Sequence, residues 1–441
     1  MKLFFRLVFG LLLICFTACE QGDNFVRPEG ADALDDPHAV TVEAALGELN
    51  GLLAEIDPAT RGGGRTVASV GTVTCGDVAS PATRSGETPE GNLVHIVQFA
   101  GGGYAVLGAD DRLPSIIAVV DEGELTAEAY AEMVRNGVPE DENGCPAVYP
   151  GIVFGPEIYE LLGENDAEVS ANIIPLSSNT IYGPWTTLKC DALIKTKWDQ
   201  GEPYNMLTPQ MNGKQTLVGC VAVAVGQIMA YKVNDYGPII CPDNIAGYDI
   251  DWWYIFNGQS RLLRLSIQSS YSDILAVAKL LRSVGEAVGM EYGVDGSAAY
   301  SRNAAVCMAN YGYSNVALET YNFEKVCSML DLDFPVYMSA TDTEKKVGHA
   351  WVIDGYTFQH RTVEIVNPQT NVVQDYRMEY RNLLHCNFGW GGSKDGYYLE
   401  GIFDLRKGQI DVNEDEYFGT RDRYYNAEKR IITYTGYYIV A

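Results

Sequence analysis

The sequence predicts an α+β protein that consists of two folded units behind an exported leader. A chain of 441 residues exceeds the size of one ordinary hydrophobic core, and its composition, 47% hydrophobic and 11% aromatic, supports folding along most of its length. In the last part of the chain, segments with helical spacing come first and a run of strands follows. This order is typical of an α+β fold and differs from the alternation of strand and helix in doubly wound proteins.

Residues 1–19 have the features of a bacterial lipoprotein signal peptide. Basic residues precede an apolar run at 7–16, and small residues stand directly before Cys19. The run is too short to cross a membrane. Cys19 is therefore the expected lipidation site, although Phe16 stands where leucine is usual and a plain secretory signal cut nearby is the alternative. Both interpretations predict export, as an outer-membrane lipoprotein in the periplasm or on the cell surface, or as a protein secreted after processing.

Charge and cysteine pattern exclude several classes of function. A formal net charge of −27 without a basic patch argues against a nucleic-acid partner, because the phosphate backbone repels such a protein. The 10 cysteines form no C-x-x-C pair, which argues against zinc-ribbon and thioredoxin-like sites. No metal and no organic cofactor are expected, and contact with the membrane is expected through the lipid anchor alone.

The first folded unit is preceded by a tether. Residues 20–65 are polar at first and then predict a short helix, which Thr41 caps and which runs to Ile56. Residues 66–174 predict a small α+β unit, and its histidine, His95, lies in an apolar strand and is interpreted as structural. The strands of this unit are expected at 93–99, 104–109 and 115–120, and its helix at 126–135.

Residues 175–184, with a proline at each end, predict a linker that is accessible to proteolytic activation. Residues 185–441 then predict the second unit. Its helices are expected at 221–231 and 273–288, and its strands at 335–340, 350–356, 362–366, 396–400 and 430–440.

Cys220 is the first candidate for a catalytic residue. It stands at the start of an apolar run, G-C-V-A-V-A-V-G-Q-I-M-A-Y at 219–231, which predicts a buried helix. Unpaired N–H groups and the helix dipole stabilise a thiolate at a helix start, so we expect a lowered thiol pKa and a nucleophile. On this run alone, a buried structural cysteine is the commoner alternative.

The histidines of the second unit could supply a general base. His360 lies between two predicted strands and is interpreted as an exposed turn residue. His349 and His385 are the candidates, and for both the alternative is a hydrogen-bonded core histidine. His349 opens the segment G-H-A-W-V-I-D-G-Y, in which Gly348 would let a substrate backbone approach and the following strand would fix the ring.

Two amide side chains complete the candidate site. Asn387, in H-C-N-F-G-W-G-G-S-K-D-G-Y-Y at 385–398, could accept the imidazole N–H and hold the ring in a productive tautomer. Gln200, in W-D-Q, could donate its amide N–H to an oxyanion together with the backbone N–H of Cys220, although a surface glutamine is the alternative. The order Gln, Cys, His, Asn favours cysteine hydrolase chemistry.

These segments together resemble the streptopain family of papain-like cysteine endopeptidases. The matching stretches are W-D-Q-G-E-P-Y-N (198–205), V-G-C-V-A-V-A-V-G-Q-I-M-A-Y (218–231), Y-G-V-D-G-S-A-A (292–299), G-H-A-W-V-I-D-G-Y (348–356) and N-F-G-W-G-G-S-K-D-G-Y-Y (387–398). The resemblance implies a papain-like fold, a helical subdomain plus an antiparallel β subdomain, at 185–441. It also implies protein or peptide substrates and synthesis as a zymogen, in which the unit at 66–174 is an inhibitory prodomain.

The resemblance further implies a role for individual residues. Gln200 would be the oxyanion donor, Cys220 the nucleophile, His349 the base and Asn387 its orienter. The substrate-binding positions would be Ser297, Gly348 and Trp390. Departures from the family pattern are Ala298 where glycine is common, Phe388 where tryptophan is common, and Lys232 where histidine is common. We expect them to alter the shape of substrate subsites.

Competing hypotheses are an inactive papain-fold binding or inhibitor protein and a Cys-His amidase or cell-wall hydrolase. The intact catalytic quartet argues against the first. The prodomain-like unit and the spacing between W-D-Q and Gly219-Cys220 argue against the second. The sequence thus predicts an exported, lipid-anchored cysteine endopeptidase that is made as a zymogen. It would hydrolyse peptide bonds in proteins through a Cys-His thiolate-imidazolium pair and an acyl-enzyme.

Overall fold

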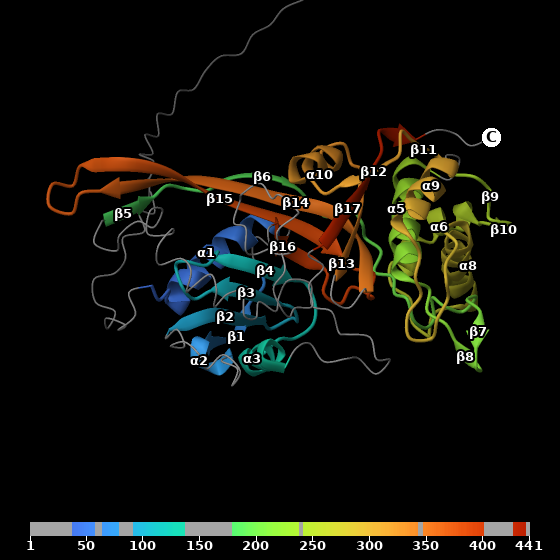
Figure 1. The fold of residues 1–441 in the computed structure, drawn as a ribbon, viewed down its shortest axis with the longest axis horizontal. Helices are drawn as coiled ribbons and strands as arrows, with labels where there is room; N and C mark the ends of the chain where they lie inside the picture. Colours follow the sequence, from blue (N-terminus) through green and yellow to red (C-terminus); the bar gives the residue numbers. More distant parts are fainter. Residues whose placement is uncertain are drawn as a thin grey trace, which may run out of the picture.

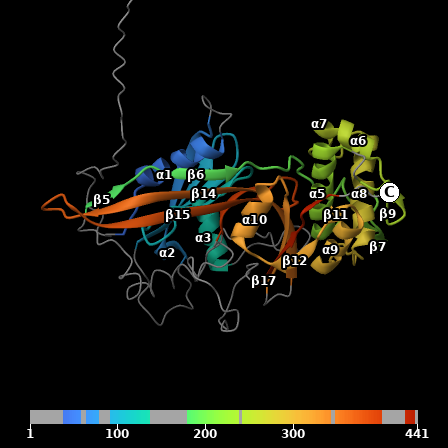
Figure 2. The same ribbon diagram turned by 90° about the horizontal axis from the view of Figure 1, so that it is seen from above.

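The computed structural model describes residues 38–57, 64–78, 91–136, 179–237, 241–342, 347–400 and 427–437. The expected signal peptide with Cys19 lies outside these residues, as do parts of the tether, the prodomain and the linker. Among the described helices, none combines the length and the apolar character that a membrane crossing needs. The chain has the expected α+β architecture, and the helices between residues 220 and 310 gather at one end of a large antiparallel sheet (Figure 1, Figure 2).

A long hairpin of two strands forms the centre of the large sheet (Figure 1). Strand β14 covers Val347–Val366 and pairs with β15, Val373–Asn387, along most of its length. The prediction of separate strands at 350–356 and 362–366 with His360 in an exposed turn is wrong. His360 is half-buried inside β14, because β15 and β6 supply hydrogen-bonding partners on both sides of the strand.

The N-terminal unit packs beneath this hairpin (Figure 1). Helix α1, Val42–Ile56, begins after Thr41, whose hydroxyl accepts the N–H of Ala44 as the capping prediction requires. Its buried leucines pack against the strands, so the helix belongs to the folded unit and not to the tether. The other elements are β1 (Val67–Thr74), α2 (Cys75–Val78), β2 (Asn92–Phe99), β3 (Tyr104–Gly108), β4 (Ile116–Val120) and α3 (Ala127–Asn136).

His95 has the structural role that the sequence predicts. Its ring is buried in β2 and forms hydrogen bonds of 2.9 Å with the Thr72 hydroxyl and with the backbone carbonyl of Val40. These bonds join the strand to β1 and to the segment that leads into α1.

The N-terminal unit and the second unit share one continuous sheet. Strand β4 pairs with β16, Gly396–Leu399, so that Val120 lies opposite Gly396 and Ala118 opposite Tyr398. The sheet order is β1-β2-β3-β4-β16-β15-β14-β13-β17-β12, and β5 and β6 also pair with β14. The sequence does not reveal this junction, because strand pattern shows which face is buried but not which edge is paired.

Part of the expected linker is a strand. Residues Asn179–Tyr182 form β5 and pair with the end of β14, and Thr186–Cys190 follow as β6 on the same strand. The Thr, Ile and Tyr of this segment suit a strand, and pairing partners distant in the sequence override its turn-like flanks.

Helix α5, Cys220–Tyr236, is the centre of the helical half. It packs between β14 and helix α8 (Tyr271–Ala287), and its apolar residues are buried on nearly every side, as predicted. The other helices are α6 (Trp252–Asn257), α7 (Gln259–Leu262), α9 (Ser301–Asn310) and α10 (Phe323–Leu330), which covers β14. The remaining strands are β7 (Gln210–Met211), β8 (Lys214–Gln215), β9 (Asn244–Ile245), β10 (Tyr248–Asp249), β11 (Tyr313–Ser314), β12 (Ala317–Thr320), β13 (Val336–Asp342), β17 (Ala427–Thr433) and β18 (Gly436–Tyr437).

Candidate active site

Cys220 is the first residue of α5, and the residue before it allows a close approach of two segments. Gly219 has φ 92°, a left-handed conformation that favours glycine. A Cβ atom there would lie 2.6 Å from the Met290 sulfur and 3.2 Å from the Ser297 Cβ. Glycine at this position therefore lets the loop that carries Ser297 pack against the start of the helix.

The Cys220 sulfur lies beside β14. The backbone N–H groups of Ala350, Val221 and Cys220 itself lie close enough to the sulfur to favour its thiolate form. Burial nevertheless raises the pKa of the thiol, and these donors oppose that change only in part. The expectation of a lowered thiol pKa is therefore wrong for this structure, because the surrounding protein removes water that a thiolate needs.

His349 lies in β14 next to Ala350 and is buried among aromatic rings. Its Nε2 is 2.9 Å from the carbonyl oxygen of Phe388, and its ring stacks on Trp390 with centroids 4.4 Å apart. Burial lowers the pKa of His349 to about 4, although the Phe388 carbonyl acts in the opposite direction. The ring is therefore neutral near pH 7. Because Nε2–H donates to the carbonyl, Nδ1 is the basic nitrogen.

Asn387 does not orient this ring through its side chain. Its Nδ2 donates to the Thr196 carbonyl at 2.8 Å, and its Oδ1 accepts from Gln227 at 2.9 Å and from the N–H of Gly389 at 3.2 Å. The expected bond from His349 is made instead by the carbonyl of Phe388. The physical reason is competition, since the buried amide of Gln227 already pairs with the Asn387 oxygen.

Gln227 is a residue of the site that the sequence analysis missed. It lies in α5, is fully buried, and its Oε1 accepts from the Thr196 hydroxyl at 2.9 Å and from the N–H of Trp198 at 3.3 Å. It thus ties the helix of Cys220 to the segments that carry Gln200 and Asn387. A lone amide in an otherwise apolar helical run was the available signal.

The other predicted residues surround the start of α5. The carbonyl of Gln200 accepts the N–H of Val218 at 2.9 Å, which places Gln200 beside the segment that enters the helix. The Ser297 hydroxyl donates to the Leu217 carbonyl at 2.7 Å, and Gly348 is exposed beside His349. Gln200 and Ser297 thus lie beside the segment that enters α5, whereas Gly348 and Trp390 lie next to His349.

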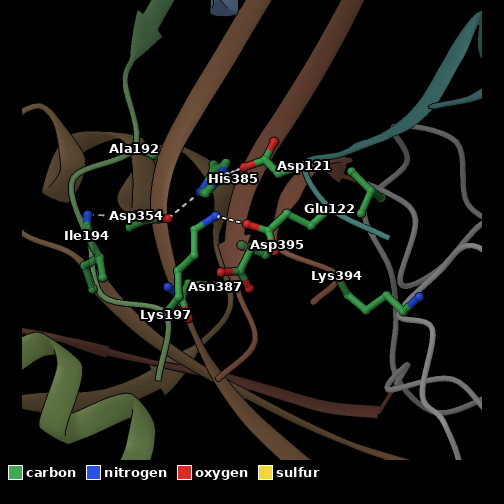
Figure 3. A network of polar contacts seen from close by, with 12 residues as sticks. Asp121, Glu122, Ala192, Ile194, Lys197, Asp354, His385, Asn387, Lys394 and Asp395 are labelled. Atoms are coloured by element: carbon green, nitrogen blue, oxygen red, sulfur yellow. Dashed lines mark hydrogen bonds and ion pairs between the residues drawn. The ribbon is translucent and has the colours of Figure 1, made fainter. Parts of the chain in front are cut away.

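His385, the other candidate base, has a different environment. Its Nδ1 lies 2.6 Å from Asp354 and its Nε2 3.5 Å from Asp121 of the N-terminal unit (Figure 3). Burial alone would lower the pKa of His385, but the charges and hydrogen bonds of Asp354 and Asp121 raise it to about 10. A ring that is charged near pH 7 cannot accept a proton, so this geometry argues against His385 as the base.

One group of described side chains has the composition of a metal site. Potential ligand atoms of His38, Asp110 and Asp111 lie within 4.8 Å of one another. However, Asp110 binds Arg112 through both carboxylate oxygens, and His38 pairs with Asp111 at 2.7 Å. Contacts within the protein thus already occupy these groups.

Comparison with known proteins gives consistent matches. The model described as "Peptidase C10 family" matches residues 198–398. Streptopain from Streptococcus pyogenes is 24% identical over 371 residues, which cover 73% of this chain and 77% of that protein. The thiol protease/hemagglutinin PrtT from Porphyromonas gingivalis is 25% identical over 325 residues, 67% of this chain and 32% of that protein. The solved structure of a prointerpain A fragment from Prevotella intermedia aligns with 83% of this chain and 98% of its own, at 20% identity and a TM-score of 0.48.

Proposed function

Because this chain belongs to the streptopain-like cysteine endopeptidases of the Peptidase C10 family, we propose that Cys220 is its nucleophile and His349 its general base. One observation carries the assignment. The backbone N–H of Ala350, the residue after His349, lies close to the Cys220 sulfur, so the strand that carries His349 passes beside the start of α5. A cysteine at a helix start near an imidazole that can take up the thiol proton is the arrangement that thiol proteases use.

The proposed cycle uses the residues of the site in turn. The basic nitrogen of His349 takes the thiol proton, and the thiolate attacks the carbonyl carbon of the scissile peptide bond. The backbone N–H of Cys220 and the side-chain amide of Gln200 stabilise the oxyanion. The imidazolium then protonates the leaving amine, and His349 activates a water that hydrolyses the acyl-enzyme.

The geometry changes the role that we assign to Asn387. In this proposal the Phe388 carbonyl fixes the tautomer and direction of His349, while Asn387 and Gln227 hold the loop that presents that carbonyl. Ser297 and Gly348 flank the substrate backbone, and Trp390 covers the ring of His349.

We further propose that the structure corresponds to a zymogen in which residues 66–174 form the inhibitory prodomain. Helix α1 packs against the strands of this prodomain. The pair is uncharged in this form, since burial raises the pKa of the thiol and lowers that of the imidazole. Strands β5 and β6 belong to the peptidase sheet, which supports an activation cut before Asn179. Export and lipidation at Cys19 complete the proposal.

Labelling of the nucleophile tests this function. The processed protein is treated with a peptidyl epoxide, and the modified residue is mapped by mass spectrometry. We expect modification of Cys220 alone, loss of casein cleavage in proportion to labelling, and no labelling of a Cys220→Ala variant. Modification of another cysteine, or hydrolysis of cell-wall or simple amide substrates without casein cleavage, would contradict the proposal.

A further inference from the structure

The surface between the N-terminal unit and the peptidase is strongly complementary in charge. Carboxylates of the N-terminal unit meet cations of the peptidase, although the chain as a whole carries a net charge of −27. The carboxylates are Glu48, Asp121 and Glu122, and the cations are Arg361, Arg381, His385, Lys197 and Arg264. Five cations of the peptidase thus lie on the face that the N-terminal unit covers, and two of them also have a peptidase carboxylate as partner.

The densest contact follows directly after strand β4. Glu122 pairs with Lys197 at 2.6 Å and with Arg264 at 2.7 Å. The preceding Asp121 approaches His385, and its backbone N–H donates to the Asp395 carbonyl at 2.9 Å (Figure 3). The segment therefore continues the pairing of β4 with β16 and ends with its carboxylates on peptidase cations.

These cations lie beside the loop of the candidate active site. A Cβ atom at Gly392 would lie 2.6 Å from Lys197 Cδ and would also meet the guanidinium of Arg264. Gly392 is two residues beyond Trp390, whose ring stacks on His349. A segment that binds Lys197 and Arg264 is thus held within a few residues of the catalytic centre.

Removal of the N-terminal unit would leave a surface that lacks partners. Strand β16 pairs with β15 on one side and with β4 on the other, so loss of β4 leaves one edge of β16 with unpaired N–H and C=O groups. Leu383 and Tyr397 pack in the core of the N-terminal unit and would lose that cover. Lys197 and Arg264 would also lose Glu122, the carboxylate that both bind in this structure.

We propose that, after activation, this surface is an exosite for an extended acidic segment of a protein substrate. The segment adds to the edge of β16 as an antiparallel strand, and its carboxylates bind Lys197 and Arg264. Strand β4 and the two residues after it, Asp121 and Glu122, indicate which kind of segment fits this surface. Such a segment has apolar residues followed by two acidic residues. The inference rests on the proposed function, because it requires that the N-terminal unit be cleaved off.

A matched pair of peptides tests the exosite by direct binding. A fluorescent peptide with the sequence of residues 114–124 is titrated into the processed protein, and a second peptide carries Asn and Gln at the positions of Asp121 and Glu122. We expect the acidic peptide to bind at least about 10-fold more tightly, as loss of close charge pairs predicts. In a Lys197→Gln/Arg264→Gln variant this difference should vanish, whereas in a Lys214→Gln control, which removes an exposed lysine of β8, it should persist.

Cleavage provides a second readout. Each variant's rate on a short neutral peptide serves as its own reference, and the acidic peptide should compete with casein more strongly than with that short substrate. Equal binding of both peptides, or equal effects of the double variant and the Lys214→Gln control, would overturn the exosite. The exosite proposal would also be overturned if the N-terminal unit stayed bound after cleavage and the acidic peptide could not displace it. Epoxide labelling of Cys220 in the same sample reports on the proposed function separately.

Discussion

Two buried histidines of the same sheet, His349 and His385, have opposite electrostatic environments. Each is 6% exposed, yet the pKa of His349 is lowered to about 4 and that of His385 is raised to about 10. His349 has aromatic rings and a backbone carbonyl around it, so burial dominates. His385 lies between the carboxylates of Asp354 and Asp121, whose charges outweigh burial. Burial therefore does not assign a role to a histidine, whereas the charge of its partners does.

The comparison separates a proton acceptor from a structural cation. A neutral ring has a basic nitrogen for the Cys220 proton, while a ring that keeps its charge to about pH 10 has none to offer. His385 instead links β15 to β14 through Asp354 and to the N-terminal unit through Asp121. Substitutions at the two histidines and at their partners can test this division.

Substitution of the catalytic pair should have the largest effect. Cys220→Ala should abolish peptide hydrolysis, because it removes the proposed nucleophile. His349→Gln should lower kcat by roughly 10³-fold or more, because it removes the proposed general base. The measurement is the hydrolysis rate of a fluorogenic peptide by the processed protein. His360→Gln, in the same strand, is the matched control and should change the rate little. A His349→Gln enzyme with near-normal kcat would contradict the assignment.

Asp354→Asn should destabilise the full-length chain without removing a reacting group. The substitution removes the carboxylate nearest to His385 and an acceptor for the N–H of Ile194. Because loss of one partner of a buried ion pair is strongly destabilising, we expect the free energy of unfolding to fall by about 3 kcal/mol or more. Urea unfolding of the Cys220→Ala background measures this effect. Asp375→Asn, at an exposed position of the hairpin, is the control. Equal stability of the two variants would show that the His385 pair contributes nothing.

The two histidines should also give opposite pH dependence of stability. His349 has a folded-state pKa of about 4 against 6.5 in the unfolded chain, so its contribution is present above pH 6.5 and is lost as the pH falls toward 4. His385 has a folded-state pKa of about 10, so its contribution is present below pH 6.5 and is lost as the pH rises through 10. Each would change the unfolding free energy by up to about 1.4 kcal/mol per pH unit in its window.

Chemical denaturation at a series of pH values checks this prediction. His349→Gln should flatten the acidic side of the stability profile, and His385→Gln should flatten the alkaline side. A His385→Gln variant that keeps the alkaline slope would mean that another group is responsible for it.

Asn387→Ala should have the smallest effect on catalysis among these changes. If the Phe388 carbonyl orients His349, removal of the Asn387 side chain only loosens the loop, and we expect a loss in kcat of roughly 10-fold. A direct side-chain orienter would give a much larger loss, of about 10⁴-fold, when its hydrogen bond is removed. Gln227→Ala should resemble Asn387→Ala, since both break the same hydrogen bond. A large loss for Asn387→Ala alone would restore the orienting role that the sequence predicts.

The sequence pattern was sufficient to predict those features of the structure that depend on interactions between residues close together in the chain. The cap at Thr41, the apolar helix that begins at Cys220 and the structural role of His95 in an apolar strand all follow from the residues around them. The motifs also supplied the α+β class and the resemblance to streptopain. Helix capping and side-chain periodicity depend on neighbours within a few residues, so a sequence states them directly.

Motifs in the amino-acid sequence identify the residues that could take part in the chemistry, whereas the packing of distant segments sets the contacts of those residues. This packing placed a carbonyl and not the Asn387 amide at His349, raised the thiol pKa at a helix start, kept His360 inside a strand, and joined β4 to β16. Each outcome depends on a partner that is distant in the chain or on the exclusion of water. Pairing between edges and the local dielectric are properties of the packed protein, and no segment of the sequence specifies them alone.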